Sequence, residues 1–241
     1  KNEFKLTAAE LEAAITPKTK ILVLPFPNNP TGSIMTEEDL KPIAELCVKH
    51  DIFVISDEIY SELTYGDEPH HSMAEFAKEN TIVINGLSKS HAMTGWRVGF
   101  ILASADIIKE IRKTHMYLVS STSSISQKAA LEAVTAGIDD ALQMKKEYQK
   151  RRDFLYEKLS SLGFEIARPN GAFYIFAKIP NGQIQDSMQF CVDLAKKAHL
   201  SVIPGIAFGK EGEGYIRISY AAAMEKLEEA MRRMESYILG K

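Results

Sequence analysis

A short polar segment that follows an apolar run contains residues capable of covalent chemistry. The apolar run covers residues 81–84, and Ser88, Lys89 and Arg97 follow it in the segment INGLSKSHAMTGWRVGF. A lysine amine can form an imine with a carbonyl carbon and then carry a proton once it is released, whereas an arginine stays protonated. Lys89 is therefore the candidate nucleophile, and Arg97 is a candidate ligand for an anion.

Two earlier apolar runs also end in polar residues. Residues 21–24 precede PFPNNPTG, which contains Asn29, and residues 52–55 precede SDEIYSEL, which contains Asp57 and Tyr60. Short apolar runs that alternate with helical patterns indicate an α/β domain with a mainly parallel sheet, buried on both faces. Because the carboxyl ends of parallel strands share one edge, we expect these three residues to converge with Lys89 and Arg97 on one pocket.

Further elements follow from hydrophobic spacing. Residues 7–15 have a helical pattern, and Thr36 with Asp39 three residues later indicates the capped start of a second helix. Residues 98–102 form a fourth apolar run. From about residue 141 to residue 162 the pattern is one long, highly charged helix, which suits a connector between two bodies.

Beyond the connector, a smaller α+β domain is expected. Strands are predicted at residues 173–179 and 215–220, and helices near residues 186–198 and 224–238. The division that follows is a large domain in residues 1–140 and a connector helix with a small domain in residues 141–241.

Composition limits the classes of partner. The 241 residues carry 29 Lys plus Arg and 32 Asp plus Glu, and the net charge of -3 gives no broad electrostatic reason to bind nucleic acid or an anionic membrane. No stretch approaches eighteen apolar residues, so no membrane span is expected. The two cysteines, Cys47 and Cys191, are far apart, which favours a reducing compartment and predicts a cytoplasmic protein.

Each motif also has an ordinary structural explanation. Asn-Pro-Thr-Gly is a turn sequence, the pair Asp57 and Glu58 could favour a helix dipole, and Ser88 could cap a helix. The pair at residues 70–71 lacks further ligands at a metal spacing, so we predict a surface loop and no metal site. The segment GIAFGKE at residues 205–211 fails as a phosphate-binding P-loop, because its glycine spacing is short and Glu211 stands where Ser or Thr must bind magnesium.

The joint occurrence of these motifs resembles the class I/II aminotransferases of fold type I, which use pyridoxal 5'-phosphate. The resemblance covers nearly the whole chain. It rests on four motifs: NPTG at residues 29–32, Asp57-x-x-Tyr60, Ser88-Lys89 with Arg97 eight residues later, and YIRISYA at residues 215–221. It implies a large domain with a mainly parallel sheet, incomplete at its N-terminal side here, plus a smaller α+β C-terminal domain.

The resemblance also implies a role for each motif residue. Lys89 would form the Schiff base with the cofactor aldehyde, and Asp57 would pair with the pyridine nitrogen. Asn29 and Tyr60 would bind the 3-oxygen. Arg97 would hold the phosphate and Arg217 the substrate carboxylate, which suits the planar fork of a guanidinium. Phe173 or Tyr174 would lie near the substrate.

The sequence departs from the family pattern at two places. Many members carry a phosphate-binding serine three residues before the lysine, and Gly86 stands there in this chain, which leaves Ser88 as a weaker candidate. The glycine-rich phosphate turn and the aromatic residue that stacks on the cofactor come from an earlier segment in the family, and no equivalent precedes Lys1. We therefore expect this chain to lack one wall of the site.

The implied function is transfer of an amino group from an amino acid to a 2-oxo acid. The segments resemble most the bacterial aromatic amino acid aminotransferases, with the N-acetyl-diaminopimelate aminotransferases of lysine synthesis next, and the sequence leaves both open. A carbon–sulfur lyase or decarboxylase that uses the same cofactor, and an aminotransferase-like regulatory domain, are further alternatives. The resemblance implies a homodimer.

Overall fold

The computed structural model describes residues 2–240, which form two compact units. Within the described range, unit 1 contains residues 2–27 and 34–145, and unit 2 contains residues 28–33 and 146–240. The short segment 28–33, which carries the NPTG turn, therefore belongs to the unit formed mainly by the second half of the chain.

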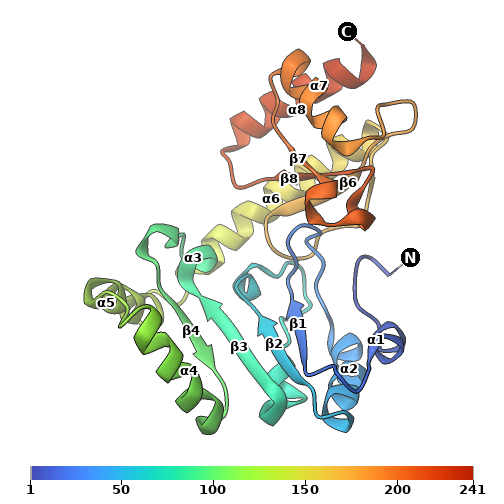
Figure 1. Ribbon diagram of the computed structural model, residues 1–241. Coiled ribbons are helices and arrows are strands. Elements are labelled where there is room, and N and C mark those ends of the chain that lie inside the picture. Colours follow the sequence, from blue (N-terminus) through green and yellow to red (C-terminus); the bar gives the residue numbers. More distant parts are fainter. Residues whose placement is uncertain (1, 241) are drawn as a thin grey trace. The chain divides into compact units, whose positions relative to one another are not determined.

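Unit 1 is built on a four-stranded sheet with the order β1-β2-β3-β4 (Figure 1). Its strands are β1 (Ile21–Pro25), β2 (Phe53–Asp57), β3 (Thr81–Gly86) and β4 (Gly99–Leu102). The pairs β1–β2 and β2–β3 are parallel, and β4 runs antiparallel to β3 at the edge. The mainly parallel sheet predicted from the apolar runs is confirmed.

Helices cover one face of β1 and β2. The helices of this unit are α1 (Ala8–Ala14), α2 (Glu37–Lys49), α3 (Leu87–Ser90), α4 (Ala105–Leu118) and α5 (Ser124–Ala133). Leu11 of α1 and Ile43 of α2 pack with Leu24 and other strand residues in one apolar cluster. On β1, however, Ile21 is 54% exposed and Val23 is 60% exposed. The expectation that β1 is covered on both faces is therefore wrong for this chain, because α1 and α2 pack on one face only.

Unit 2 contains an antiparallel sheet with the order β5-β6-β8-β7. The strands are β5 (Glu165–Ile166), β6 (Tyr174–Lys178), β7 (Ile203–Pro204) and β8 (Tyr215–Ser219). The helices are α6 (Asp140–Ser161), which begins in unit 1, α7 (Ser187–Ala198) and α8 (Met224–Leu239). The two longer strands and three helices expected in this region all form, with ends within two residues of those predicted.

The longest of these helices, α6, has 22 residues and is rich in charged side chains. Its charge follows the pattern predicted for residues 141–162. Across residues 2–240, no helix combines the length and the apolar composition that a bilayer-spanning segment needs.

The start of α2 is fixed by a reciprocal cap that the sequence predicted. Thr36 Oγ1 accepts a hydrogen bond from the Asp39 backbone N–H at 3.3 Å, and Asp39 Oδ2 accepts one from the Thr36 N–H at 2.9 Å. Asp39 Oδ2 also accepts a bond from Lys5 Nζ at 2.8 Å. The cap satisfies two backbone donors and ties the start of the chain to the helix that supports β1 and β2.

Replacing Thr36 with alanine removes this acceptor. Thr36→Ala should lower the free energy of unfolding by about 1 kcal/mol. Thr36→Ser keeps the hydroxyl and should stay close to the wild type. Urea unfolding followed by circular dichroism measures both, and equal losses in the two variants would show that the cap contributes nothing.

Candidate active site

The parallel strands of unit 1 bring their carboxyl ends level with one another. Pro25 at the end of β1 pairs with Asp57 at the end of β2, and Asp57 pairs with Ile84 of β3. The Glu58 N–H continues the pairing by donating to the Ile84 carbonyl at 2.8 Å. Asp57 is half-buried, and its Oδ1 accepts a bond from the Ile59 N–H at 3.2 Å. The carboxylate is thus fixed at the sheet edge where ligands of open α/β sheets bind.

Lys89 lies in the single turn of helix that follows β3. Its Nζ is 5.6 Å from the centroid of the Tyr60 ring, which is within the range of a cation–π contact. Tyr60 is buried and follows β2, so the contact joins residues from two neighbouring strand ends. Ser88, in the same turn, is half-buried. The structure therefore brings Lys89 and Tyr60 together, as expected.

Gly86, which stands where the family resemblance leads one to expect a serine, has a structural role in this chain. A Cβ added there would lie 3.0 Å from Gly99 Cα and 3.1 Å from the Val98 carbonyl oxygen. Glycine thus permits the close approach of β3 and β4 just before the lysine turn.

Arg97 occupies a left-handed backbone conformation, with φ of 53°. This conformation is uncommon for a residue with a side chain and persists where surrounding contacts enforce it. One such contact comes from Ser126, whose Oγ donates to the Trp96 carbonyl at 2.7 Å. The Arg97 guanidinium donates from Nη1 to the Thr94 carbonyl at 2.9 Å and is exposed, so it has further donors for an anion.

Glu58 is a buried carboxylate that the sequence reasoning treated only as a helix-dipole acid. It accepts hydrogen bonds from Ser56 Oγ at 2.9 Å and Ser72 Oγ at 2.7 Å, and His70 Nε2 lies 3.0 Å from its Oε2. His70 lies in a loop, as predicted for residues 70–71, but it is half-buried and contacts Glu58. The signal in the sequence was weak, because the partners are 12 and 14 residues away from Glu58.

These contacts change the acidity of Glu58. Burial raises its pKa, but the hydrogen bonds from His70 and Ser72, the charge of His70 and the bond from Ser56 together outweigh burial and place the pKa below its ordinary value. Glu58 is thus a charged structural group on the opposite side of the strand from Asp57. The two neighbouring acids have separate tasks, and Asp57 alone faces away from this network.

In unit 2, the NPTG turn presents Asn29 to Arg217. Asn29 Oδ1 accepts a hydrogen bond from Arg217 Nη1 at 2.8 Å. The turn is held by Gly32, which has φ of 71° and donates to the Asn28 carbonyl at 2.9 Å. A Cβ on Gly32 would overlap Pro169 and lie 2.9 Å from the Tyr174 carbonyl oxygen. The turn is therefore specific to glycine and packs against the segment that leads into β6.

Arg217 lies on β8 and contacts two aromatic rings. Its guanidinium carbon is 4.5 Å from the centroid of the Tyr174 ring and 5.0 Å from that of the Phe208 ring. Family resemblance indicated Tyr174, but Phe208 was missed because it lies in the GIAFGKE segment, which was considered only as a nucleotide loop. The structure thus joins Asn29 to Arg217 within unit 2 and Lys89 to Tyr60 within unit 1. The convergence of all these residues on one pocket stays a prediction.

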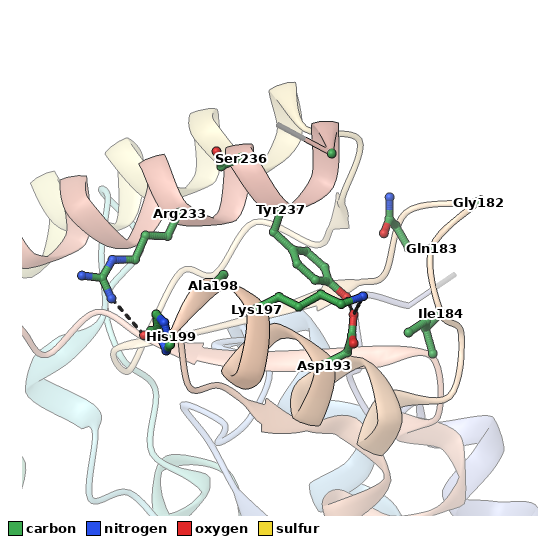
Figure 2. Close-up of a pocket in the computed structure, with 11 residues that line it drawn as sticks. Gly182, Gln183, Ile184, Asp193, Lys197, Ala198, His199, Arg233, Ser236 and Tyr237 are labelled. Carbon is green, nitrogen blue, oxygen red and sulfur yellow. Dashed lines mark hydrogen bonds and ion pairs between the residues drawn. The ribbon is translucent and has the colours of Figure 1, made fainter.

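A cavity in unit 2, away from Arg217, has a volume of about 700 Å³ and lies between α7, α8 and the loop at residues 182–184 (Figure 2). Its charged residues bond to neighbouring groups of the protein. Asp193 Oδ2 accepts from Tyr237 Oη at 2.8 Å and pairs with Lys197 at 3.0 Å, while Arg233 donates to the His199 carbonyl at 3.0 Å. None of the residues predicted to bind cofactor or substrate lines it.

Comparison with known proteins decides the family. The family model described as "Aminotransferase class I and II" matches residues 1–234. The chain belongs to the class I and II aminotransferases. It is 53% identical, over 99% of its length, to a probable N-acetyl-LL-diaminopimelate aminotransferase of Bacillus subtilis, of which it covers 60%. It is 41% identical, over its whole length, to aromatic-amino-acid aminotransferase 2 of Thermococcus litoralis, of which it covers 62%.

Solved structures of aminotransferases share the fold. An aromatic aminotransferase from Pyrococcus horikoshii superposes with a TM-score of 0.95 at 43% sequence identity, with 99% of this chain and 65% of that chain covered. The chain thus spans about three-fifths of the length of the curated relatives it matches.

The residues present fit the cofactor of class I and II aminotransferases, pyridoxal 5'-phosphate. Besides its 3-oxygen, the cofactor carries an aldehyde, a ring nitrogen and a phosphate. Unit 1 of this chain offers a lysine amine just after β3, a half-buried carboxylate at the end of β2 and an exposed guanidinium at Arg97. These donors suit the aldehyde, the ring nitrogen and the phosphate in turn.

The Glu58 network should contribute to stability in a pH-dependent manner. Glu58→Gln should lower the free energy of unfolding at pH 7 by about 1–3 kcal/mol, because a charged acceptor of several bonds is lost. The folded-state pKa is depressed, so this contribution is present above the unfolded value and is lost as the pH falls through the folded value. The difference between wild type and variant should therefore shrink below about pH 4.3, the ordinary value for glutamate.

Urea unfolding at several pH values between 7 and 3 measures this difference. The matched control is Glu62→Gln, which changes an exposed glutamate in the same region and should leave the curve unchanged. A Glu58→Gln difference that stays constant with pH would contradict the assignment of a charged, stabilised carboxylate.

Proposed function

We propose that this chain carries the lysine, acid and arginine residues of an aminotransferase that moves an amino group from an amino acid to a 2-oxo acid. The observation that carries the proposal is the position of Lys89. It lies in the helical turn that follows β3, its Nζ is within cation–π distance of the Tyr60 ring, and β3 is the neighbour of the strand that ends in Asp57. Family membership supports the same reaction class.

Lys89 is the residue to which we assign both covalent attachment and proton transfer. Bound pyridoxal phosphate supplies an aldehyde for imine exchange and a ring that accepts electrons when the substrate α proton leaves. A lysine amine can attach to that group, leave it, and then take the α proton as a base. The Tyr60 ring beneath Nζ restricts where the released amine can move.

The other site residues are proposed to bind and tune the cofactor. Asp57 favours a protonated ring nitrogen, because a carboxylate stabilises a neighbouring positive charge. Arg97, which is exposed, binds the phosphate, and the half-buried Ser88 contributes more weakly. Tyr60 and Asn29 are assigned to the 3-oxygen.

Arg217 is proposed to bind the substrate carboxylate. One edge of its guanidinium already donates to Asn29, which fixes the plane of the group. The planar guanidinium can then bind a carboxylate by donating two parallel hydrogen bonds to it. The amino donor and the 2-oxo acceptor each carry such a carboxylate, so one arginine can bind the substrate of both half-reactions.

The comparisons bear on the choice of donor. The identity of 53% to the probable N-acetyl-LL-diaminopimelate aminotransferase exceeds the identity of 41% to the aromatic enzyme. We therefore place an N-acetyl-diaminopimelate type of donor beside the aromatic amino acids predicted from sequence. We also propose that the protein acts as a cytoplasmic homodimer, in line with the two reduced, buried cysteines and with the implied family architecture.

Covalent labelling tests the role of Lys89. After incubation with pyridoxal phosphate and reduction with borohydride, peptide mapping should find the pyridoxyl group on the peptide that contains Lys89. Lys89→Ala should lose the label and lower turnover by at least roughly 100- to 10,000-fold, the usual range for a proton-transfer residue. Lys109→Ala, which removes an exposed lysine from α4, is the control and should keep both. Label elsewhere in the wild type would overturn the assignment.

A donor screen tests the substrate class. Phenylalanine, tyrosine, aspartate and N-acetyl-LL-diaminopimelate would each be offered with 2-oxoglutarate, and glutamate formation would be measured. The highest kcat/KM should belong to N-acetyl-LL-diaminopimelate or to an aromatic donor. A clear preference for aspartate would contradict both.

A further inference from the structure

The segment around Phe208 has a regular backbone held by several contacts, and none of the residues assigned to the cofactor or the substrate lies in it. It consists of two consecutive turns of 3-10 helix, Gly205–Phe208 and Lys210–Gly212, between β7 and β8. The two turns touch through backbone alone: a Cβ on Gly205 would overlap the Gly212 carbonyl oxygen, and one on Gly212 would overlap the Gly205 carbonyl. Both glycines are therefore required for this close approach.

Side chains fix the same segment to α7. Glu213 Oε1 accepts bonds from the N–H of Ser187, the first residue of α7, at 2.6 Å and from the N–H of Gly214 at 3.1 Å. Ser187 Oγ, which is fully buried, accepts a bond from the Ile206 N–H at 3.3 Å. The segment is thus held at three points, and its position is set by the helix terminus and the glycine contact.

These contacts fix the position of the Phe208 ring. Phe208 packs edge-on against Phe176, with centroids 6.0 Å apart and planes at 87°. Phe176 pairs directly with Arg217 across β6 and β8, so both side chains are on one face of the sheet. The Arg217 guanidinium carbon is 5.0 Å from the centroid of the Phe208 ring and 4.5 Å from that of the Tyr174 ring. The guanidinium thus contacts both rings.

The hydrogen bonding of Arg217 shows which edge remains for a ligand. Nη1 donates to Asn29. Nε is buried and has no hydrogen-bond partner among the described residues, so the inner edge of the group is held by packing. Nη1 and Nη2 lie away from the buried Nε and still carry donors for a ligand. A planar, two-oxygen anion is the ligand that suits this edge.

We propose that Phe208 and Tyr174 are positioning residues for Arg217, and that the segment from Gly205 to Glu213 exists to hold Phe208 in place. The proposal rests on the proposed function, because it takes the ligand of Arg217 to be the carboxylate that donor and acceptor share. The two ring contacts restrict the orientation of the guanidinium and shield it from water. They contribute to carboxylate affinity and not to the choice of substrate side chain.

Phe208 is the better residue to change, since it is 36% exposed and Tyr174 is buried at 8%. Phe208→Leu keeps the apolar character and removes the ring, and Phe208→Tyr keeps the ring. Phe53→Leu is a matched control on β2, with a similar exposure of 37%. Arg217→Lys tests whether a probe binds at this arginine at all, because a lysine cannot form the two-pronged contact.

Isothermal titration of the cofactor-loaded protein with maleate and with 3-phenylpropanoate measures carboxylate affinity without turnover. Phe208→Leu should raise the dissociation constants of both probes by a similar factor, roughly three- to tenfold, the range for loss of one cation–π face. Phe208→Tyr and Phe53→Leu should bind both probes as the wild type does. The KM values of amino donor and oxo acceptor should rise together in Phe208→Leu, while kcat and the affinity for pyridoxal phosphate stay unchanged.

Several results would overturn the proposal. Unchanged affinities in Phe208→Leu would show that the ring does not position Arg217. A change for only one probe would make Phe208 part of a side-chain pocket. Equal binding by wild type and Arg217→Lys, or no binding by either, would show that Arg217 does not take the carboxylate. Failure of the proposed function gives a different result. A wild type that binds both probes but transfers no amino group would contradict the reaction and would leave the role of Phe208 at Arg217 standing.

Discussion

The pairing of three parallel strands is the constraint on which the proposed cofactor site of this chain depends. In-register pairing sets the end of β2 beside the ends of β1 and β3, and the bond from the Glu58 N–H to the Ile84 carbonyl extends that register past the last strand residue. Asp57 and the turn that carries Lys89 therefore start from neighbouring positions. A slip of one residue would turn Asp57 to the face on which Glu58 is buried, and would place Glu58 where the ligand belongs.

The adjacent acids Asp57 and Glu58 have different surroundings. Glu58 is enclosed by two serine hydroxyls and an imidazole, which keep it charged and immobile. Asp57 accepts a backbone bond and remains half-buried at the sheet edge. In unit 2, Arg217 is restrained in two ways, by its hydrogen bond to Asn29 and by its contacts with the Tyr174 and Phe208 rings. Both units thus combine a reactive or ligand-binding group with others that restrict its position.

Much of the fold was accessible from the sequence because the periodic signals were local. The apolar runs predicted β1 to β3, and the Thr36 cap predicted the start of α2. Contacts between distant residues were not accessible: the bonds from His70 and Ser72 to Glu58, and the packing of Phe208 on Arg217, depend on loops whose paths no local pattern encodes. The exposed face of β1 was also missed, since an apolar run predicts burial without saying whether this chain supplies the covering layer.

The central claim is that this protein moves nitrogen from one carbon skeleton to another. The most direct measurement offers an amino donor labelled with nitrogen-15 together with an unlabelled 2-oxo acid, and follows the label by mass spectrometry. The account predicts that the label appears in the amino acid formed from the 2-oxo acid, and that Lys89→Ala abolishes this transfer. Release of the label as ammonium, with no labelled amino acid, would contradict the account and would indicate a lyase.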